Sequence, residues 1–350
     1  MINDIGKISS DFFTNQIQLK LGAPNSQILV KPGIGLDVSV IDLEVQNLAL
    51  IVTADPISFL PKIGPTESAI LSLNYLINDM ATSGFSPKFA QFVFNLSHQI
   101  TTAEFQEYWT AIHNYSSQIN LSITGGHTGF VENELSTTIG GGTFFTIADK
   151  SQILCSNLAQ STDAILMTKT SALAASFVLS KSFPNYIAKN TSSQIVDLCN
   201  KNIHFTSSLL EALFVKKHFP NDLHAMHDVT EGGILGAVYE MSIASQLNFE
   251  LWEDKITLGQ AESAICQLFN IDPIIVDGAG SMIMACNSLK VPEIIESLKS
   301  INIKCTEIGK FLPNSFGNKL ISKDNLKNIE SLPQDPYWQT YFKAVKQGWD

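Results

Sequence analysis

The chain has 350 residues, enough for two hydrophobic cores, because single cores stop growing at about 250–300 residues. Its 33 acidic and 22 basic residues give a net charge of −11, which argues against binding to nucleic acid or to acidic membrane surfaces. Every basic residue is a lysine, so bidentate guanidinium clamps on phosphate are excluded. A bound phosphate would therefore be held by lysine, by backbone N–H groups or by a metal ion.

The sequence also indicates the cellular compartment. No apolar run is long enough to span a bilayer, and the N-terminus lacks the basic-then-apolar order of a signal peptide. The five cysteines are odd in number, widely spaced and set in apolar segments, which is typical of reduced thiols in a protein core. We therefore expect a cytoplasmic protein without membrane segments.

The first 150 residues alternate between strand-like and helix-like segments. Short apolar runs between turn residues predict strands, and apolar residues at helical spacing predict helices. The predicted helices cover residues 11–20, 68–81 and 101–117, and the predicted strands cover residues 27–30, 38–43, 48–53, 89–96, 121–124 and 137–147. The strand at 48–53 is expected to stop at Asp55-Pro56, because proline has no N–H for the ladder.

The pattern restarts between Asp149 and Gln160, where we expect a domain boundary. The predicted strands of the second part cover residues 164–168, 223–227, 248–252, 281–286 and 304–308, and its helices cover residues 173–179, one or two stretches of 194–214, 232–245, 258–269 and 291–300. We expect three parts, which are residues 1–155, residues 156–330 and a helical tail of residues 331–350 from Pro333 onward. Alternation in both halves predicts two α+β or α/β domains.

The predicted helix at residues 68–81 is apolar nearly all round, so we expect it to be buried. Thr66 can cap its start, and Gly84 can supply a left-handed C-cap. This helix nevertheless carries Asn78 and Asp79. A buried carboxylate is costly unless it is hydrogen-bonded, paired or bound to a cation. Two interpretations stay open: Asp79 caps a neighbouring loop, or it holds a metal ion at the rim of a pocket.

Three aspartates lie at element junctions. Asp37 follows a glycine loop, Asp55 follows a predicted strand, and Asp79 lies on the buried helix. Mg²⁺ is typically held by a few carboxylates while it keeps waters and substrate phosphates as its other ligands. Asp37 and Asp55 also fit ordinary turn chemistry, so a structural role for each stays open.

Two glycine motifs are further candidates. The sequence GGHT at residues 125–128 follows a predicted strand, and its N–H groups could cradle a phosphate in a loop. The sequence HDVTEGG at residues 227–233 precedes a predicted helix, whose capped N-terminus would bind an anion. A plain loop and a plain capped helix are the alternatives. Neither motif has the spacing of a P-loop or of a dinucleotide fingerprint.

Five motifs follow one another within residues 5–310, namely GIGLDVSVID, TADPI, LINDMATSGFSPKF, ITGGHT and HDVTEGG. In this order they resemble the aminoimidazole-ribonucleotide (AIR) synthase-like superfamily. That group includes the purine-pathway cyclo-ligase (PurM), thiamine-monophosphate kinase, selenophosphate synthetase and the hydrogenase maturation protein HypE. The combination of NDxAxxGxxPK, GGHT and HDxTEGG is most similar to the HypE-like, AIR synthase-related branch.

The resemblance implies a two-domain PurM-like fold. Its N-terminal α+β domain would form a barrel with the sheet of a second subunit, making a homodimer, and its C-terminal domain would be α/β. ATP and Mg²⁺ would lie in the groove between the domains. Such enzymes phosphorylate a substrate oxygen and so make it a leaving group for dehydration or ring closure. The acceptor would be a small molecule or a group on a partner protein.

The resemblance also implies roles for individual residues. Asp37, Asp55 and Asp79 would bind Mg²⁺ and the phosphates, and His227 and Asp228 would act in catalysis. The other nucleotide-binding residues would be Gly35, Asn78, Gly125, Gly126, His127, Thr128, Glu231, Gly232 and Gly233.

Two departures from the family pattern leave alternatives open. Leu36 stands where family members usually have the first residue of an acidic pair, which keeps open a nucleotide-binding regulatory protein without turnover. HypE ends in a cysteine that accepts the carbamoyl group, whereas this chain ends in KQGWD and its last cysteine, Cys305, lies in a predicted core strand. A small-molecule kinase, such as a thiamine-monophosphate kinase, is the alternative enzyme.

Overall fold

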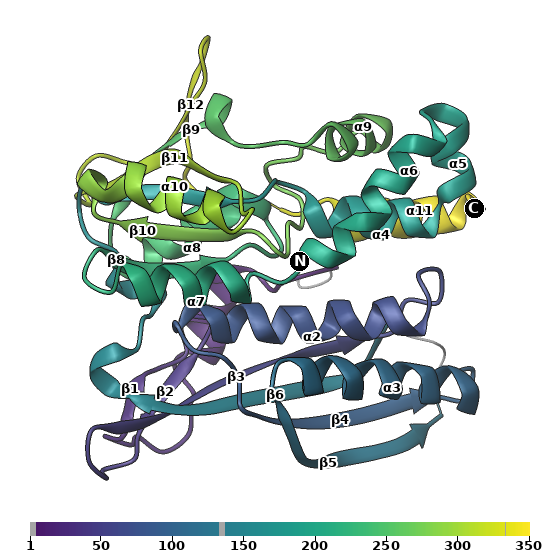
Figure 1. The fold of residues 1–350 in the computed structure, drawn as a ribbon, viewed down its shortest axis with the longest axis horizontal. Coiled ribbons are helices and arrows are strands. Elements are labelled where there is room, and N and C mark those ends of the chain that lie inside the picture. The colour runs from purple at the N-terminus through teal and green to yellow at the C-terminus, as the bar shows by residue number, and fades with distance from the viewer. Residues whose placement is uncertain (1–4, 133–136, 333) are drawn as a thin grey trace.

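The computed structural model describes residues 5–132, 137–332 and 334–350, and it contains two β-sheets with helices packed between them (Figure 1). A six-stranded sheet comes from residues 28–149 and a seven-stranded sheet from residues 164–328. Both parts mix helices and strands, as the sequence predicted. The expected domain limits at residues 155 and 330 stay a prediction. Within the described residues, no helix has both the length and the hydropathy that crossing a bilayer requires.

The six-stranded sheet has the order β1-β2-β3-β6-β4-β5. Its strands are β1 (Ile28–Val30), β2 (Ser39–Asp42), β3 (Leu48–Ser58), β4 (Phe89–Ser97), β5 (Ser122–Val131) and β6 (Thr138–Asp149). Strands β4 and β5 are parallel, and the other neighbours are antiparallel. The helices α2 (Pro65–Thr82) and α3 (Thr102–Gln118) cover one face of this sheet (Figure 1).

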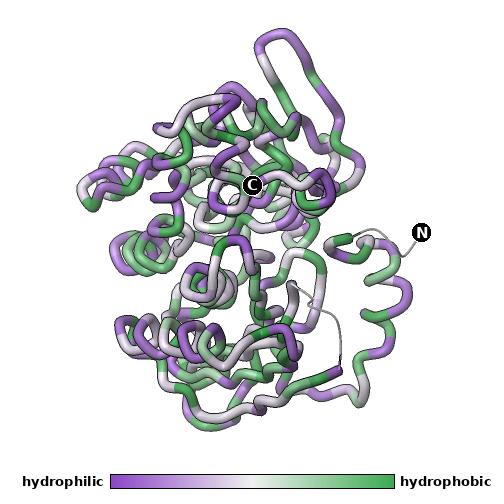
Figure 2. Tube along the Cα trace, turned by 90° about the vertical axis from the view of Figure 1, so that its right-hand side faces the viewer, coloured by the Kyte–Doolittle hydropathy of each residue, from purple (hydrophilic) through white to green (hydrophobic). Residues whose placement is uncertain are grey.

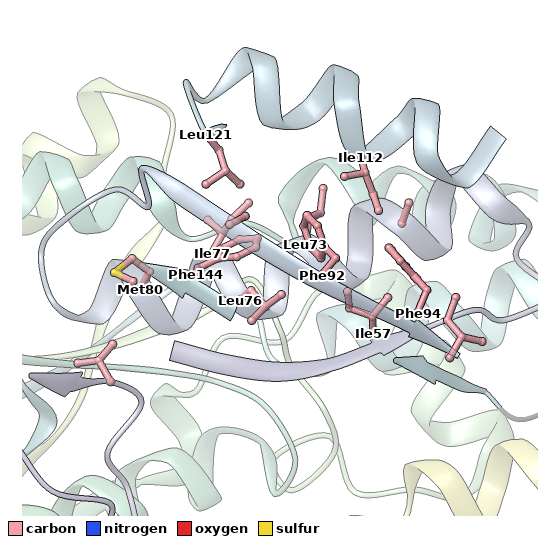
Figure 3. Packing of buried hydrophobic residues seen from close by; sticks show 14 of the residues in the cluster. Ile57, Leu73, Leu76, Ile77, Met80, Phe92, Phe94, Ile112, Leu121 and Phe144 are labelled. Carbon is pink, nitrogen blue, oxygen red and sulfur yellow. The ribbon is translucent and has the colours of Figure 1, made fainter. Parts of the chain in front are cut away.

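The alternation of β4 shows which face is the core. Phe92 and Phe94 are buried against the helices, whereas Val93 between them is 45% exposed on the opposite face. Figure 3 shows Phe92 and Phe144 of the sheet packed with Leu73 of α2. The sheet therefore has one buried face and one outer face that the helices do not cover.

Two sequence predictions for this sheet were wrong. Strand β3 does not stop before Pro56 but continues to Ser58, with Pro56 opposite Gly141 of β6. The last residue of β3 that pairs with β2 is Val52, so the following stretch has an open edge, where a proline is tolerated. The GGHT segment is not a loop, because it forms part of β5 and pairs with β4.

Helix α2 lies between the two sheets, and its polar side chains fasten it to the second part. The Nδ2 groups of Asn74 and Asn78 donate to the Oγ1 and the carbonyl of Thr206 at 2.7 and 2.9 Å, and Ser208 N–H donates to Asn78 Oδ1 at 2.8 Å. Gly84 ends the helix with a φ of 80°, as predicted. The predicted Thr66 cap was wrong: Pro65 is the first helical residue, after Gly64 as N-cap. The Thr66 hydroxyl donates to Glu107 on α3 instead.

The seven-stranded sheet has the order β13-β12-β9-β11-β7-β10-β8 and is antiparallel except for the β9–β12 pair. Its strands are β7 (Ala164–Thr168), β8 (Leu223–Asp228), β9 (Asn248–Trp252), β10 (Met282–Cys286), β11 (Cys305–Leu312), β12 (Lys319–Ile321) and β13 (Leu326–Asn328). Its helices are α4 (Leu173–Ser182), α5 (Pro184–Asn190), α6 (Ser193–Asn200), α7 (Leu209–His218), α8 (Gly233–Ser245), α9 (Gln260–Phe269) and α10 (Val291–Ser300). The sequence did not predict α5, β12 or β13.

Both ends of the described chain lie against the body. Residues 5–17, which we call the N-terminal arm, include α1 (Ser10–Phe12) and a π-helical turn (Phe13–Ile17) without a buried residue. Figure 2 shows this arm along the outside of the molecule. The tail forms α11 (Tyr337–Lys346), and Trp349 stacks on Tyr186 with ring centroids 3.7 Å apart. Pro333, where the tail was expected to begin, lies outside the described residues.

Candidate functional site

The candidate site lies where β8 ends and α8 begins. Both glycines between them have left-handed backbones, with φ of 89° at Gly232 and 61° at Gly233. A Cβ on Gly233 would come within 2.6 Å of the carbonyl oxygen of Ile274, so only glycine fits this turn. The loop before Asp37 lies against the backbone of α8, because a Cβ on Gly35 would lie 2.3 Å from the carbonyl oxygen of Glu240. Glycines thus bring the Asp37 loop directly onto α8.

His227 forms the centre of a buried ion-pair chain. Its Nδ1 lies 2.8 Å from Asp37 Oδ1, and its Nε2 lies 3.1 Å from Glu240 Oε2. Burial by itself lowers the pKa of His227, but the charges of Asp37 and Glu240 raise it well above its usual range. Both ring nitrogens then carry protons, so His227 is an imidazolium that holds two carboxylates in place. Glu240 keeps a pKa of about 2 despite its burial, because Lys7 and His227 stabilise its charge.

Asp228 is buried beside this chain and has an unsatisfied oxygen. Its Oδ2 has no hydrogen-bond partner, and the residue is only 3% exposed. Burial, together with the charge of Asp37, raises the pKa of Asp228 to about 8. Asp37, His227 and Asp228 are the one group of three in the described chain whose ligand atoms all lie within 4.8 Å of one another. Because His227 is engaged at both nitrogens, the two carboxylates are the better metal ligands.

Two further predicted carboxylates face Asp228. Burial, followed by the charges of Asp228, Asp55 and Asp37, raises the pKa of Asp79 well above its usual range, although the Thr53 hydroxyl donates to its Oδ2 at 2.6 Å. Burial raises the pKa of Asp55 to about 7, against the lowering effect of Lys7. The three predicted metal ligands therefore share one electrostatic environment. The tightest arrangement includes Asp228 rather than Asp55 or Asp79.

Lys7 brings a positive charge to this cluster from the N-terminal arm. Its Nζ lies 3.2 Å from Glu240 Oε1, and its backbone N–H donates to Glu231 Oε2 at 2.7 Å. Burial by itself lowers the pKa of Lys7, but the charges of Glu240, Asp228 and Glu231 raise it overall. The side chain as a whole is 52% exposed, while its ammonium group lies against Glu240 and Thr230.

The C-terminal tail forms another wall of the site. Asp335 Oδ2 accepts the Gly232 N–H at 3.1 Å, and Trp338 Nε1 donates to Glu231 Oε1 at 3.3 Å. Burial, and then the charge of Asp277, raises the pKa of Asp335 to about 7. A cavity of about 820 Å³ lies between the tail, α8 and the N-terminal arm.

The structure separates some predicted nucleotide-binding residues from this cluster. Asn78 uses its amide to hold the 206–208 segment, as described above. Strand register places Gly126 in line with Asp55 but three strands away, which is about 14 Å. His127 pairs with Val93 and therefore faces the outer side of the sheet. Within one chain, the GGHT residues do not join the carboxylates.

Among the charged residues whose contacts build the site, Lys7, Glu240 and Asp335 were not predicted. Glu240 had a signal that sequence reasoning missed, because it is the single charged residue on the apolar helix GILGAVYEMSIAS. That is the same argument that identified Asp79. Lys7 and Asp335 lie in segments without regular periodicity, and their contacts bridge 224 and 103 residues of sequence. No local pattern carries that information.

The fold and the site together define a class: two mixed α/β units packed about a buried helix, with a carboxylate cluster at their junction. Residues 35–145 match the family described as "AIR synthase related protein, N-terminal domain", and residues 163–316 match its C-terminal domain. The chain therefore belongs to the AIR synthase-related family. The PurM-like fold and the superfamily expected from the sequence motifs are confirmed.

Individual relatives agree with this assignment. A protein of Methanocaldococcus jannaschii, provisionally named a hydrogenase expression/formation protein, is 30% identical over 77 residues, which are 22% of this chain and 23% of that protein. The structure of HypE in complex with ATP has a TM-score of 0.67 at 15% identity and covers 93% of each chain. The structure of AaThiL complexed with AMPPCP and TMP has a TM-score of 0.66 at 16% identity, covering 86% of this chain and 90% of that one. At such identities the structural likeness shows the fold alone.

Proposed function

We propose that the protein is an ATP- and Mg²⁺-dependent enzyme that activates a substrate oxygen by phosphorylation, in the manner of HypE. The observation that carries the proposal is the unsatisfied Asp228 Oδ2, buried among Asp37, Asp55 and Asp79. An unpaired buried carboxylate oxygen is costly, and a bound cation removes that cost. The ATP complex of HypE, with the same fold, supports a nucleotide as the group that accompanies the metal.

The residues present fit Mg²⁺. This ion prefers carboxylate oxygens and keeps several waters and phosphate oxygens as its remaining ligands. Asp37 and Asp228 would hold it, with Asp55 and Asp79 near enough to share its charge. When bound, the ion would neutralise negative charge on the phosphates. The chain has no arginine for that purpose.

The protein's own groups would then position the reactants. The His227 imidazolium fixes the orientation of Asp37 through the contact at its Nδ1. Gly232 and Gly233 place the start of α8 beside the cluster, but the N–H groups of Gly232, Gly233 and Leu235 already donate to Asp335, Thr230 and Ile274, so the expected anion site at this helix end is not supported. Lys7 is the lysine whose charge acts on Asp55, Asp228 and Asp277, and its ammonium group, paired with Glu240, would offset part of the negative charge of this cluster. His227 and Asp228 remain our predicted catalytic residues.

Replacing Asp79 with asparagine tests the proposal, because it keeps the shape of the side chain and removes its charge. We expect Mg²⁺-dependent ATP binding to weaken by about 1.5–3 kcal/mol, the value of a charge-assisted contact. Asp197→Asn, at an exposed position of α6, is the matched control. Both variants are titrated with Mg²⁺–ATP by calorimetry after thermal unfolding has confirmed the fold. Unchanged ATP affinity in a folded Asp79→Asn protein would remove the metal role of this cluster.

A small-molecule kinase is the second candidate, favoured by the likeness to AaThiL bound to AMPPCP and TMP. The products separate the two: a kinase leaves the phosphoryl group on its product, whereas the HypE-type reaction releases phosphate and removes water. The third outcome is a regulatory protein that binds ATP without turning it over, which would agree with Leu36 at a position where family members usually have an acidic residue. Phosphorus NMR of ATP with candidate acceptors distinguishes all three.

We also propose a homodimer. The outer face of the six-stranded sheet carries exposed apolar side chains, among them Phe89, Val93 and Ile147, which are 38–51% exposed. Exposed apolar faces of this kind mark interaction sites. A second copy would cover them, and it is also the arrangement in which His127 could approach a nucleotide. A group on a partner protein stays open as the acceptor, since a HypE–HypF complex has the same fold.

A further inference from the structure

The cavity of about 820 Å³ beneath the N-terminal arm adjoins the carboxylate cluster through a shared residue. Glu240 lines this cavity and at the same time contacts His227 Nε2 at 3.1 Å. Volumes of about 300–1,000 Å³ are typical of small-molecule sites. A molecule in the cavity would therefore lie next to the proposed phosphate site.

The charges that line the cavity are mostly negative. One lysine faces five acidic residues, which are Asp11, Glu231, Glu240, Glu330 and Asp335. The lysine is Lys7, and its ammonium group is already paired with Glu240. The ion pair of Lys7 therefore shows that the acidic wall of the cavity accepts a positively charged nitrogen group.

The hydrogen-bond donors around these carboxylates are already engaged. Glu231 accepts both the Lys7 N–H and the Trp338 Nε1–H, and Asp335 accepts the Gly232 N–H. The Tyr239 hydroxyl donates to the carbonyl oxygen of Glu330 at 2.9 Å. A ligand with N–H groups would find carboxylate oxygens with lone pairs to spare. Ser10, Thr14, Asn15 and Gln334 also line the cavity and can either donate or accept, so the acidic groups decide which charge the ligand carries.

The same walls offer apolar surface. Trp338 and Tyr239 present aromatic rings, and Ile243 of α8 is partly exposed beside them. Aromatic rings attract cations through their faces, most strongly where water is excluded. Negative charge, free acceptors and aromatic walls all favour the same kind of ligand.

We propose that this cavity is the acceptor-substrate site and that it selects an apolar molecule with a positively charged nitrogen group, against phosphorylated or carboxylated acceptors. The inference rests on the proposed function, because an acceptor must lie beside the nucleotide. It also bears on the choice among functions, since it disfavours an acceptor that already carries a phosphate. The N-terminal arm would form the roof over the bound molecule.

Three compounds of equal size and different charge test this selection. Phenethylamine, 2-phenylethanol and phenylacetate are titrated into the full chain by ligand-observed NMR, in the presence and absence of Mg²⁺ and AMPPCP. We expect phenethylamine to bind at least about tenfold more tightly than phenylacetate, with the alcohol between them. Equal affinities, tighter binding of phenylacetate, or no binding of any compound at about 10 mM would overturn the inference.

Two variants assign the binding to this cavity. Glu231→Gln removes a wall charge and should lower the preference for the amine about tenfold, whereas Glu253→Gln, outside the cavity, should leave it unchanged. Ile243→Trp fills the cavity and should abolish binding of both the amine and the alcohol. Amine binding that survives both changes would place the compound elsewhere and overturn the inference.

The experiment also separates this inference from the proposed function. Calorimetry with Mg²⁺–ATP on the wild-type protein tests the nucleotide site by itself. If the chain binds phenethylamine more tightly than phenylacetate but does not bind ATP, the selectivity of the cavity is supported and the proposed enzyme is refuted. If the chain binds ATP but binds the three compounds equally well, the proposed enzyme is supported and this inference is refuted.

Discussion

Asp228→Asn should stabilise the metal-free protein while removing its response to Mg²⁺. The pKa of Asp228 is about 8 in the folded chain, against an ordinary value of 3.8, because the group is buried next to Asp37. In the unfolded chain at pH 7 the carboxyl group is ionised, so folding must supply it with a proton. Asparagine has nearly the same shape and carries no charge, so that cost disappears.

The magnitude follows from the difference between the two states. About three pKa units separate pH 7 from the ordinary value, and each unit corresponds to about 1.4 kcal/mol, which gives at most about 4 kcal/mol. Asp37, Asp55 and Asp79 lie in the same cluster and would take up part of the shared proton. We therefore expect a gain of about 2–3 kcal/mol, or roughly 3–4 °C in the unfolding midpoint of a chain of this length.

The assay is thermal unfolding at pH 7, first with a chelator and then with Mg²⁺ and AMPPCP. Wild-type protein should gain about 2.7 kcal/mol from a ligand present at a hundred times its dissociation constant, whereas Asp228→Asn should gain little. Asp197→Asn, exposed on α6, should behave like the wild type in both conditions. An Asp228→Asn protein that is less stable without metal, or that responds to Mg²⁺ and AMPPCP like the wild type, would refute the reasoning.

Three further outcomes follow from the same contacts. Raised pKa values of about 7 at Asp55 and about 8 at Asp228 mean that the folded chain binds protons that the unfolded chain releases, so the contribution of these two groups to stability without Mg²⁺ is complete below about pH 4 and is lost as the pH rises to 8. The lowered pKa of Glu240 acts in the opposite direction only in the acid range, so unfolding midpoints are compared between about pH 5 and pH 8, and midpoints that stay level or rise there would contradict this. Val93→Lys on the outer sheet face should convert the proposed dimer to a monomer in light scattering, and a wild-type chain that is already monomeric at micromolar concentration would sink the dimer. The five buried cysteines should form no stable adduct with ATP, Mg²⁺ and a carbamoyl donor, because burial raises their thiol pKa values (to about 12 at Cys305, for example), and an adduct in the intact mass that disappears on mutating one cysteine would restore the HypE mechanism.

Local sequence patterns predicted those elements whose burial agrees with their periodicity. The limits of β7, β9 and α10 match the prediction at both ends. Strand β3 was predicted too short because the open edge that tolerates Pro56 depends on where β2 stops. Strand β5 was taken for a loop because glycines usually mark loops, whereas here they lie in a strand where neighbouring backbones are close: a Cβ on Gly126 would lie 1.8 Å from the carbonyl oxygen of Phe92. Both errors concern strand pairing, which no single segment encodes.

In the candidate site, too, local patterns predicted some residues, whereas others depend on contacts between distant segments. The place of Asp79 among other carboxylates could be predicted because a carboxylate on an apolar helix needs a partner, while its role in holding a metal ion stays a prediction. The contacts that complete the site could not be predicted, since Lys7 and Asp335 reach it from opposite ends of the chain. Their positions can be explained only from the structure, in which both contact the segment between β8 and α8.

Helix α2 explains why the site depends on both parts of the molecule. Asn74 and Asn78 fasten this helix to Thr206 in the second part, while Asp79, one residue further on, faces the carboxylates. A shift of the second part against the first would therefore move Asp79 relative to Asp228, which lies on β8. When no cation is present, burial favours the protonated forms of these carboxyl groups, as the raised pKa values of Asp79 and Asp228 indicate, and a bound cation would instead stabilise their charged forms. The polar contacts of α2 keep the site assembled when no cation is bound.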